Sequence, residues 1–323
     1  MSPISLGPHT SNAFETFEPR FRDVLGDEPR LVKVADVDAH EGPVFAKGAL
    51  YFTSLPRHDR PGYPEVSIKR LEIDTVSLQG LSLTTVRENA NAANGMTLAP
   101  DGRLLVCEQG SLDEPGRISL VDPQTSDAET VVDGLAGLPL NSPNDVVVAG
   151  DGAIWFTDPS YGYLQGFRPE PAHGDFVYRY EPAPERLRVV AADFDKPNGL
   201  AFSPDGRTLY VGDSGANHEP GSFDPRRPHH IRAFDVVDGR LVNDRLFAVT
   251  TPGFPDGLKV DADGRVYASA FSGVQVFDPD GELIGEIALP GAVNFTFGGR
   301  GRNVLFITTD TALWAAVLKT KGA

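Results

Sequence analysis

Short apolar runs separated by glycine turns recur along this chain at a regular interval. Each copy consists of an acidic or amide residue, an apolar strand, a glycine turn and a second apolar strand. The copies begin at Glu41, Asn94, Asn144, Asn198, Asp256 and Asn294. Their turn glycines follow seven or eight positions later, at Gly48, Gly102, Gly152, Gly206, Gly264 and Gly301. Repetition at a fixed period is typical of a propeller or a solenoid.

Two further apolar segments follow each of the first five copies, so each unit holds four short strands. Four strands per repeat match a propeller blade, and we predict an all-β, six-bladed propeller with four antiparallel strands per blade. The sixth unit lacks one strand before the chain ends. The segment LVKVADV from Leu31 can supply it, so an N-terminal strand is predicted to close the ring in the C-terminal blade. We expect residues 1–30 to form a tail or short helix and residues 31–323 a single propeller domain.

Composition limits the possible partners. The 29 basic and 45 acidic residues give a net charge of −16, which disfavours nucleic acid and anionic membrane surfaces. The one cysteine, Cys107, lies within an apolar strand, so no intramolecular disulfide is possible and its thiol is expected to be buried. With no apolar leader and no long apolar span, we expect a cytoplasmic protein that is a monomer or a weak homo-oligomer.

The polar residue that opens each copy suggests a metal site. The first strand of a propeller blade lines the central channel, so six such residues form a ring at one end. Unpaired carboxylates and amides are costly to bury there, and a divalent cation removes that cost. Oxygen-only ligation favours Ca²⁺ first, then Mg²⁺ or Mn²⁺, with Zn²⁺ also open. The alternative is that these side chains only cap turns before the strands.

Three long connections are predicted to surround the same end of the channel. They follow the second strands of the first, third and fourth units, at residues 54–66, 158–175 and 213–230. The turns at the opposite end are short. Long loops around a channel mouth are typical of a substrate pocket, so the asymmetry favours an enzyme over a docking ring.

Several longer motifs stand around the ring positions: EGPVF at Glu41, CEQG at Cys107, LNSPND…WFTDPSYGY from Leu140, KPNGLAFSPDG from Lys196, FPDGLKVDADG from Phe254 and TFGG at Thr296. Together these motifs resemble the senescence-marker (regucalcin)/gluconolactonase family of six-bladed propellers. The resemblance covers about residues 35–318. Two positions depart from the family pattern. Gln109 stands where the gluconolactonase-like branch has a histidine, and Ser142 stands where the regucalcin branch has an arginine.

The resemblance implies roles for individual residues. One divalent ion would be held by Glu41, Asn144, Asn198 and Asp256. Asn294 would support the site. The expected substrate-binding residues are Asn94, Gln109, Asn141, Tyr161 and Tyr163. For the two tyrosines, packing of the pocket rim is the favoured role and direct substrate contact the alternative. No organic cofactor is expected.

The leading functional hypothesis is metal-dependent opening of a lactone, such as a sugar lactone of the gluconolactone type. The ion would polarise the carbonyl, and Asp256, with Glu41 beside it, would be the catalytic carboxylate that activates water. Direct attack by Asp256 is the less favoured variant. The alternatives are a phosphotriesterase resembling diisopropyl-fluorophosphatase and a non-catalytic calcium-binding propeller. A Ser-His-Asp triad has no support, because the sequence contains no G-x-S-x-G elbow.

Overall fold

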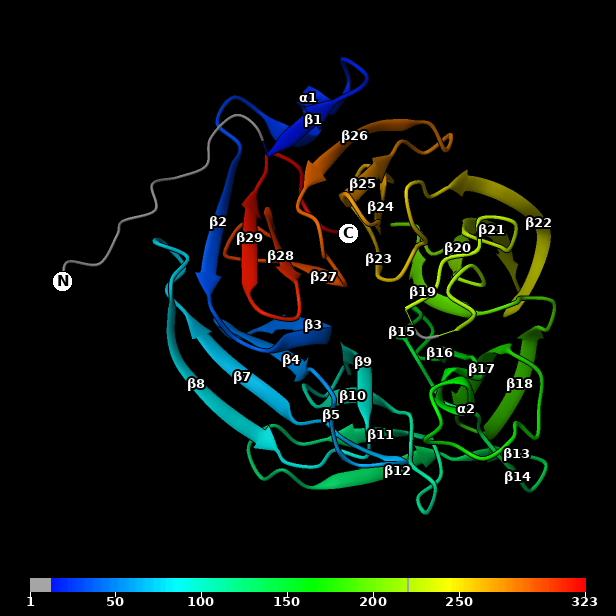
Figure 1. Cartoon of the computed structure of the whole chain (residues 1–323). Coiled ribbons are helices and arrows are strands. Elements are labelled where there is room, and N and C mark those ends of the chain that lie inside the picture. The colour runs from blue at the N-terminus through cyan, green and yellow to red at the C-terminus, as the bar shows by residue number, and fades with distance from the viewer. Residues whose placement is uncertain (1–12, 220) are drawn as a thin grey trace.

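The computed structural model describes residues 13–219 and 221–323, which form six antiparallel sheets arranged as the blades of a ring (Figure 1). The strands of each blade are given from the channel outwards. The first blade contains β3 (Ala39–Ala46), β4 (Ala49–Ser54), β7 (Ile68–Ile73) and β8 (Gly80–Arg87), and the second contains β9 (Ala93–Leu98), β10 (Leu104–Glu108), β11 (Arg117–Val121) and β12 (Ala128–Val132). The third contains β15 (Val146–Val148), β16 (Ile154–Asp158), β17 (Phe176–Pro182) and β18 (Glu185–Ala191).

The fourth blade contains β19 (Pro197–Phe202), β20 (Thr208–Asp213), β21 (His230–Val237) and β22 (Arg240–Val249), and the fifth contains β23 (Leu258–Val260), β24 (Val266–Ser269), β25 (Gly273–Phe277) and β26 (Leu283–Ala288). The sixth contains β27 (Phe295–Gly298), β28 (Val304–Thr308), β29 (Leu313–Val317) and β2 (Arg30–Ala35). The all-β propeller predicted from the repeats is therefore confirmed.

The ring closes as the sequence predicted. Strand β2 pairs antiparallel with β29, with Leu31 opposite Ala316, and so completes the sixth blade from the N-terminal side. The innermost strands of the first and sixth blades, β3 and β27, also contact each other.

Apolar packing is concentrated between neighbouring blades. Each interface between two adjacent blades holds its own cluster of buried side chains within the described chain. Cys107 is fully buried in the cluster between the second and third blades, as expected for a structural thiol. Because each blade is held by two neighbours, the ring gives the channel a rigid wall.

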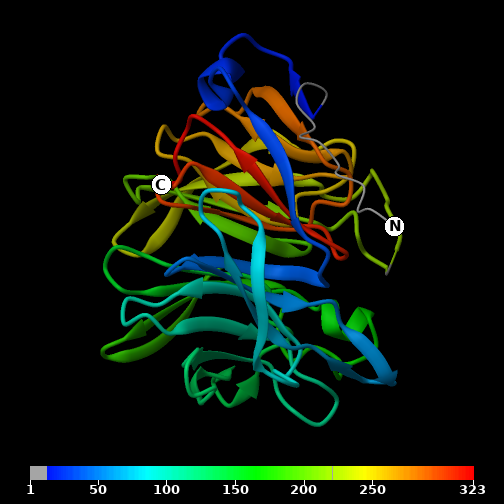
Figure 2. The same ribbon diagram turned by 90° about the vertical axis from the view of Figure 1, so that its left-hand side faces the viewer.

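The segment before β2 packs on the outer edge of the ring (Figures 1 and 2). Strand β1 (Phe14–Thr16) pairs with β26, and helix α1 (Phe21–Leu25) buries Phe21 in the cluster between the fifth and sixth blades. Burial of a phenylalanine contributes about 2–3 kcal/mol, which helps to hold this short segment in place. The repeat pattern did not predict β1. Residues 1–12 of the expected tail lie outside the described part.

The long loops all lie at one end of the channel, because they join second to third strands. The first contains the hairpin β5 (Arg57–Arg60) and β6 (Tyr63–Glu65), and the second contains helix α2 (Tyr161–Leu164). Residues 133–144 enter the third blade at the same end through the hairpin β13 (Gly134–Leu135) and β14 (Leu138–Pro139). No helix in the described ranges is long and apolar enough to cross a membrane.

The short turns lie at the opposite end. In the first five copies the predicted turn glycine adopts a positive φ, between 69° and 89°. The sixth copy differs, because there Gly299 (φ 79°) and Arg302 (φ 55°) take this conformation and Gly301 does not. An arginine in the left-handed region carries a steric cost that glycine avoids.

Candidate functional site at the hub

The six polar residues of the repeats lie at the start of the innermost strands. Three of them fall within β3, β9 and β19, and three lie one or two residues before β15, β23 and β27. Glu41, Asn144, Asn198 and Asn294 are buried, whereas Asn94 and Asp256 are half-buried. Because neighbouring innermost strands contact each other around the ring, these six positions surround one end of the channel (Figure 1).

Glycines allow the polar segments to approach each other closely. The Gly95 N–H donates to the Asn144 carbonyl at 2.8 Å, and the Gly199 N–H donates to the Asp256 carbonyl at 3.0 Å. A Cβ atom at Gly199 would lie 2.2 Å from that carbonyl oxygen. Four of the six ring positions are followed by glycine, because a side chain there would collide with the neighbouring innermost strand. Simple hairpins would not require glycine at these positions.

Hydroxyl groups at the ends of second strands bind the next blade. Thr157 Oγ1 donates to the Asn198 carbonyl at 2.8 Å, and Thr308 Oγ1 donates to the His40 carbonyl at 2.6 Å. In the fifth blade, Ser269 Oγ accepts the Asp256 N–H at 2.9 Å. These bonds fix the backbone of the hub, so the side chains projecting from it are pre-positioned.

Two buried aspartates hold the loops that lead into the hub. Asp158, at the end of β16, accepts the N–H groups of Asn141 and Ser142 at 2.9 and 2.8 Å. Asp213, at the end of β20, makes the equivalent pair of bonds to the segment before Asn198. Removal from water raises the pKa of Asp158 to about 7, although the two amide bonds and Arg168 oppose the shift.

Glu41 and Asp256 carry the negative charge of the hub. Asn294 Nδ2 donates to Glu41 Oε2 at 2.7 Å, and the Gly42 N–H donates to the same oxygen at 3.1 Å. Removal from water and the charge of Glu41 raise the pKa of Asp256 well above its usual range, although Asn198 opposes the shift. Two like charges so placed repel each other unless a cation or a proton intervenes.

The donor set at the hub fits a hard cation. Within the described ranges no group of three or more His, Cys, Asp or Glu side chains could hold a metal, so a site here would combine Glu41 and Asp256 with amides. Asn94 Oδ1 is buried without a hydrogen-bond partner among the described atoms. A buried amide oxygen lacking a donor, beside two repelling carboxylates, is suited to an oxygen-ligated divalent ion.

A buried carboxylate next to this ring was missed by sequence reasoning. Asp145 follows Asn144 where four other ring residues are followed by glycine. Its Oδ1 accepts the Val146 N–H at 2.9 Å, and its Oδ2 has no partner among the described atoms. Burial raises the pKa of Asp145 to about 6, opposed by Lys259 and assisted by Glu41. The departure from the X-Gly pattern was the signal that could have revealed it.

A histidine beside the hub was also missed. His40 directly precedes Glu41, and its Nδ1 lies 2.6 Å from Asp310 Oδ1. Burial lowers the pKa of His40, but the bond to Asp310 and the charge of Glu41 outweigh burial, so the net shift is upward. His40 is brought to the hub by Glu41, its neighbour in the repeat, and has no repeated signal of its own in the sequence.

The expected substrate-binding residues fall into two groups. Tyr161 is buried and its hydroxyl donates to the Ser214 carbonyl at 3.3 Å; burial and then the charge of Asp256 raise its pKa far above the usual range. Asn141 is buried too, and its Nδ2 donates to the Gly174 carbonyl at 3.0 Å, which leaves Oδ1 unpaired among the described atoms.

The other members are less deeply buried than Tyr161 and Asn141. Tyr163 is 47% exposed on α2. Gln109 is half-buried directly after β10, and its N–H donates to the Ala92 carbonyl at 3.1 Å, two residues before Asn94. Asn94, Gln109 and Asn141 therefore enter the mouth from the second blade and the loop that leads into the third.

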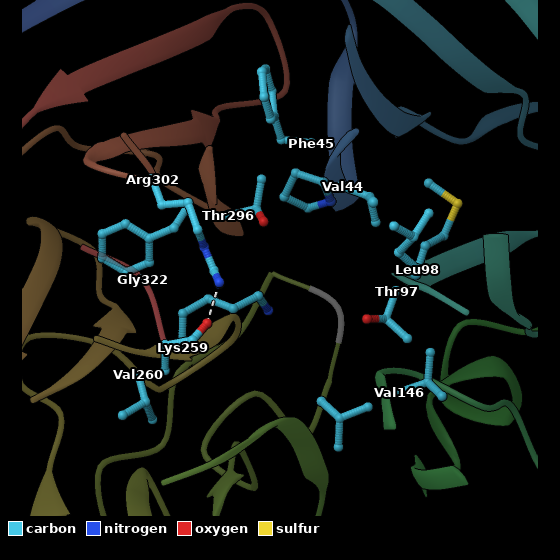
Figure 3. A pocket seen from close by; sticks show the side chains of 15 residues that line it. Val44, Phe45, Thr97, Leu98, Val146, Lys259, Val260, Thr296, Arg302 and Gly322 are labelled. Atoms are coloured by element: carbon cyan, nitrogen blue, oxygen red, sulfur yellow. Dashed lines mark hydrogen bonds between the residues drawn. The ribbon is translucent and has the colours of Figure 1, made fainter. Parts of the chain in front are cut away.

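The opposite end of the channel has a different character. A cavity of about 270 Å³ lies there. Figure 3 shows its lining by later residues of the innermost strands, among them Thr97, Val146 and Thr296. Lys259 also lines it, and no carboxylate side chain is among its lining residues. The long loops lie at the other end, with the carboxylates, so the candidate site lies at that end.

Comparison with known proteins places this geometry in context. The family profile described as "SMP-30/Gluconolactonase/LRE-like region" matches residues 39–311. The chain is similar to a gluconolactonase of Zymomonas mobilis, with 31% identity over 98% of this chain and 89% of the relative. It is also similar to the lactonohydrolase oryL of Aspergillus oryzae, with 27% identity over 88% of this chain and 69% of the relative.

Among solved structures, a gluconolactonase from Xanthomonas campestris superimposes with a TM-score of 0.77 and 36% sequence identity, covering 95% of each chain. The matched region contains all six ring positions, from Glu41 to Asn294. The likeness therefore extends over the hub and the mouth loops as well as the blades.

Proposed function

Because the chain belongs to the SMP-30/gluconolactonase/LRE-like family of lactonases, we propose that it opens a lactone ring at the hub in a reaction that depends on a divalent cation. The observation that carries the proposal is the pair of mutually repelling carboxylates, Glu41 and Asp256, set among amide oxygens. Water attack on the carbonyl carbon would break the ring C–O bond and give a hydroxy acid.

Four residues would hold the ion: Glu41, Asn144, Asn198 and Asp256. Their all-oxygen donor set favours Ca²⁺, with Mg²⁺, Mn²⁺ and Zn²⁺ as alternatives, and two carboxylates balance a double positive charge. Bound there, the ion would supply Lewis-acid polarisation of the lactone carbonyl. Asn294 would keep Glu41 in position through its 2.7 Å hydrogen bond.

Asp256 would serve as the general base. Removal from water, and then the nearby charge of Glu41, raise the pKa of this carboxyl, which favours proton transfer from water. The proton taken from water would then pass to the ring oxygen as the C–O bond breaks, so the carboxylate is regenerated. Glu41 would contribute to catalysis through its charge, and direct attack by Asp256 remains the alternative path.

Five side chains would orient the substrate: Asn94, Gln109, Asn141, Tyr161 and Tyr163. Asn94 and Asn141 each have a buried amide oxygen without a donor, which can accept a hydrogen bond from a ligand. Tyr161 would pack against the bound ring, because its hydroxyl is already committed to Ser214.

A substrate panel tests this function. Purified protein would be assayed on aldonolactones, aliphatic lactones and phosphotriesters, each with and without EDTA. We expect lactone hydrolysis that EDTA removes and Ca²⁺ restores. A preference for phosphotriesters would favour the phosphotriesterase alternative, and no hydrolysis of any substrate would favour a calcium-binding role.

A further inference from the structure

Exposed aromatic side chains gather at the mouth of the channel. In the described chain, four Phe, Tyr or Trp residues are largely exposed: Phe17, Tyr163, Phe223 and Phe271. Phe17 lies at the outer edge beside β26, whereas the other three lie in loops at the mouth. Exposed apolar side chains that gather on one face indicate a binding surface, whereas singly scattered ones are common on any protein.

Three phenylalanines form a continuous patch, which we call the aromatic patch: Phe223, Phe254 and Phe271. The rings of Phe223 and Phe271 meet edge to face with centroids 5.3 Å apart, and those of Phe254 and Phe271 do so at 5.4 Å. The exposed fractions of Phe223 and Phe271 are 37% and 48%. The patch thus presents apolar surface to solvent while its members hold each other in place.

The aromatic patch is connected to the hub. Phe254 lies two residues before Asp256, and the Phe271 N–H donates to the Pro252 carbonyl at 3.0 Å, which binds the two loops together. Ser214 Oγ donates to the Pro255 carbonyl, and the Ser214 carbonyl accepts the hydroxyl of Tyr161. A wall of backbone and rings therefore runs from the proposed base to the rim of the fourth and fifth blades.

The opposite side of the mouth is charged. Strand β5, in the loop of the first blade, consists of Arg57, His58, Asp59 and Arg60, and all four side chains are exposed. A ligand seated at the hub would meet polar groups on this side and apolar rings on the other. The mouth is thus suited to a molecule with one polar and one apolar end.

On the premise of the proposed lactonase function, we propose that the aromatic patch is a subsite for an apolar substituent of the lactone. The preferred substrate would then carry an alkyl or aryl group on the ring, in contrast to the hydroxyl groups of a sugar lactone. The lactone carbonyl would face Asp256, and the substituent would lie against Phe271 and Phe223. The three rings offer apolar surface and no hydrogen-bonding group, so each methylene group added to the substituent should strengthen its binding to the patch.

A homologous series of substrates tests the subsite. The δ-lactones valerolactone, hexalactone, octalactone and decalactone share one ring and differ only in alkyl length. We expect kcat/KM of the wild-type protein to rise about two- to fourfold for each added methylene group, and to exceed that for glucono-1,5-lactone. In Phe271→Ser and Phe223→Ser the gain per methylene should fall towards onefold.

Phe17→Ser is the matched control, because Phe17 is equally exposed but lies at the outer edge of the ring. It should keep the wild-type gain per methylene, and circular dichroism should show the same fold in all variants. The subsite is disproved if kcat/KM does not depend on alkyl length, if gluconolactone is the best substrate, or if the patch variants keep the wild-type gain. Hydrolysis of no lactone at all would instead reject the proposed function on which the subsite rests.

Discussion

Asn294 and Glu41 meet at the hub, where Asn294 Nδ2 donates to Glu41 Oε2 across 2.7 Å. The two residues are 253 positions apart in sequence and belong to the last and first blades. This bond joins the ends of the ring at the carboxylate that we assign to the metal. This contact therefore links the two ends of the ring directly to the preparation of the site.

Removal of this contact should weaken metal binding. In Asn294→Ala, Glu41 Oε2 keeps the Gly42 N–H but loses its side-chain donor, so the carboxylate is held less firmly. We expect affinity for Ca²⁺ to fall about 10- to 100-fold, the usual effect of removing a partner of a metal ligand. Calorimetric titration measures the change. Asn303→Ala is the control, because it removes an asparagine hydrogen bond at the turn between β27 and β28.

Neutralising the proposed base should stop turnover. Asp256→Asn keeps the size of the side chain but can no longer accept a proton from water. We expect kcat to fall at least about 100-fold, within the range of general base catalysis. Retention of more than about a tenth of wild-type kcat, measured at saturating substrate, would remove Asp256 from this role.

The glycine next to Asn198 should not tolerate a methyl group. In Gly199→Ala, the new Cβ would lie 2.2 Å from the Asp256 carbonyl and would push the fourth and fifth blades apart. We expect a loss of about 1–3 kcal/mol in the free energy of unfolding, measured by urea denaturation. At Gly150, no heavy atom lies within 4 Å of an added Cβ, so Gly150→Ala should leave the stability almost unchanged.

Asp158 should make stability depend on pH. Its folded-state pKa of about 7 lies above the value of about 3.9 in an unfolded chain. The folded state therefore holds more protons between these values, and this residue's contribution to stability is present below pH 4 and is lost as pH rises through 7. We expect this contribution to fall by at most about 1.4 kcal/mol per pH unit in EDTA-treated protein.

Urea denaturation of EDTA-treated protein between pH 4.5 and 8 measures this effect. Asp158→Asn should flatten the dependence, because an amide does not titrate in this range. An equal slope in the variant and the wild-type protein would show that other groups cause the pH dependence.

The repeats made the architecture and the hub residues predictable. A fixed polar position before each pair of strands places Glu41, Asn144, Asn198 and Asp256 at one end of the channel whatever the loops do. The sixth unit lacks one strand in sequence order, which predicts that the segment at Leu31 completes the last blade, as β2 does. Periodicity is thus informative wherever the same local structure occurs several times.

Features that occur only once were not predicted, because they leave no repeated pattern in the sequence. Strand β1 pairs through backbone hydrogen bonds with β26, which leaves no repeated signal in its side chains. His40 and Asp145 are single departures beside ring positions, and the contact between His40 and Asp310 joins residues 270 positions apart. The aromatic patch is formed by three loops of irregular length, so only the folded chain brings its rings together.

The most direct test of the account is a titration of EDTA-treated protein with Ca²⁺ in which heat and lactone hydrolysis are followed at the same molar ratios. The account predicts no activity without the ion, one ion bound per chain, and a rate that reaches its plateau at that ratio. The double variant Glu41→Gln, Asp256→Asn should lose both signals. Full activity in EDTA, or Ca²⁺ binding that survives in the double variant, would contradict the assignment of the hub as the metal site.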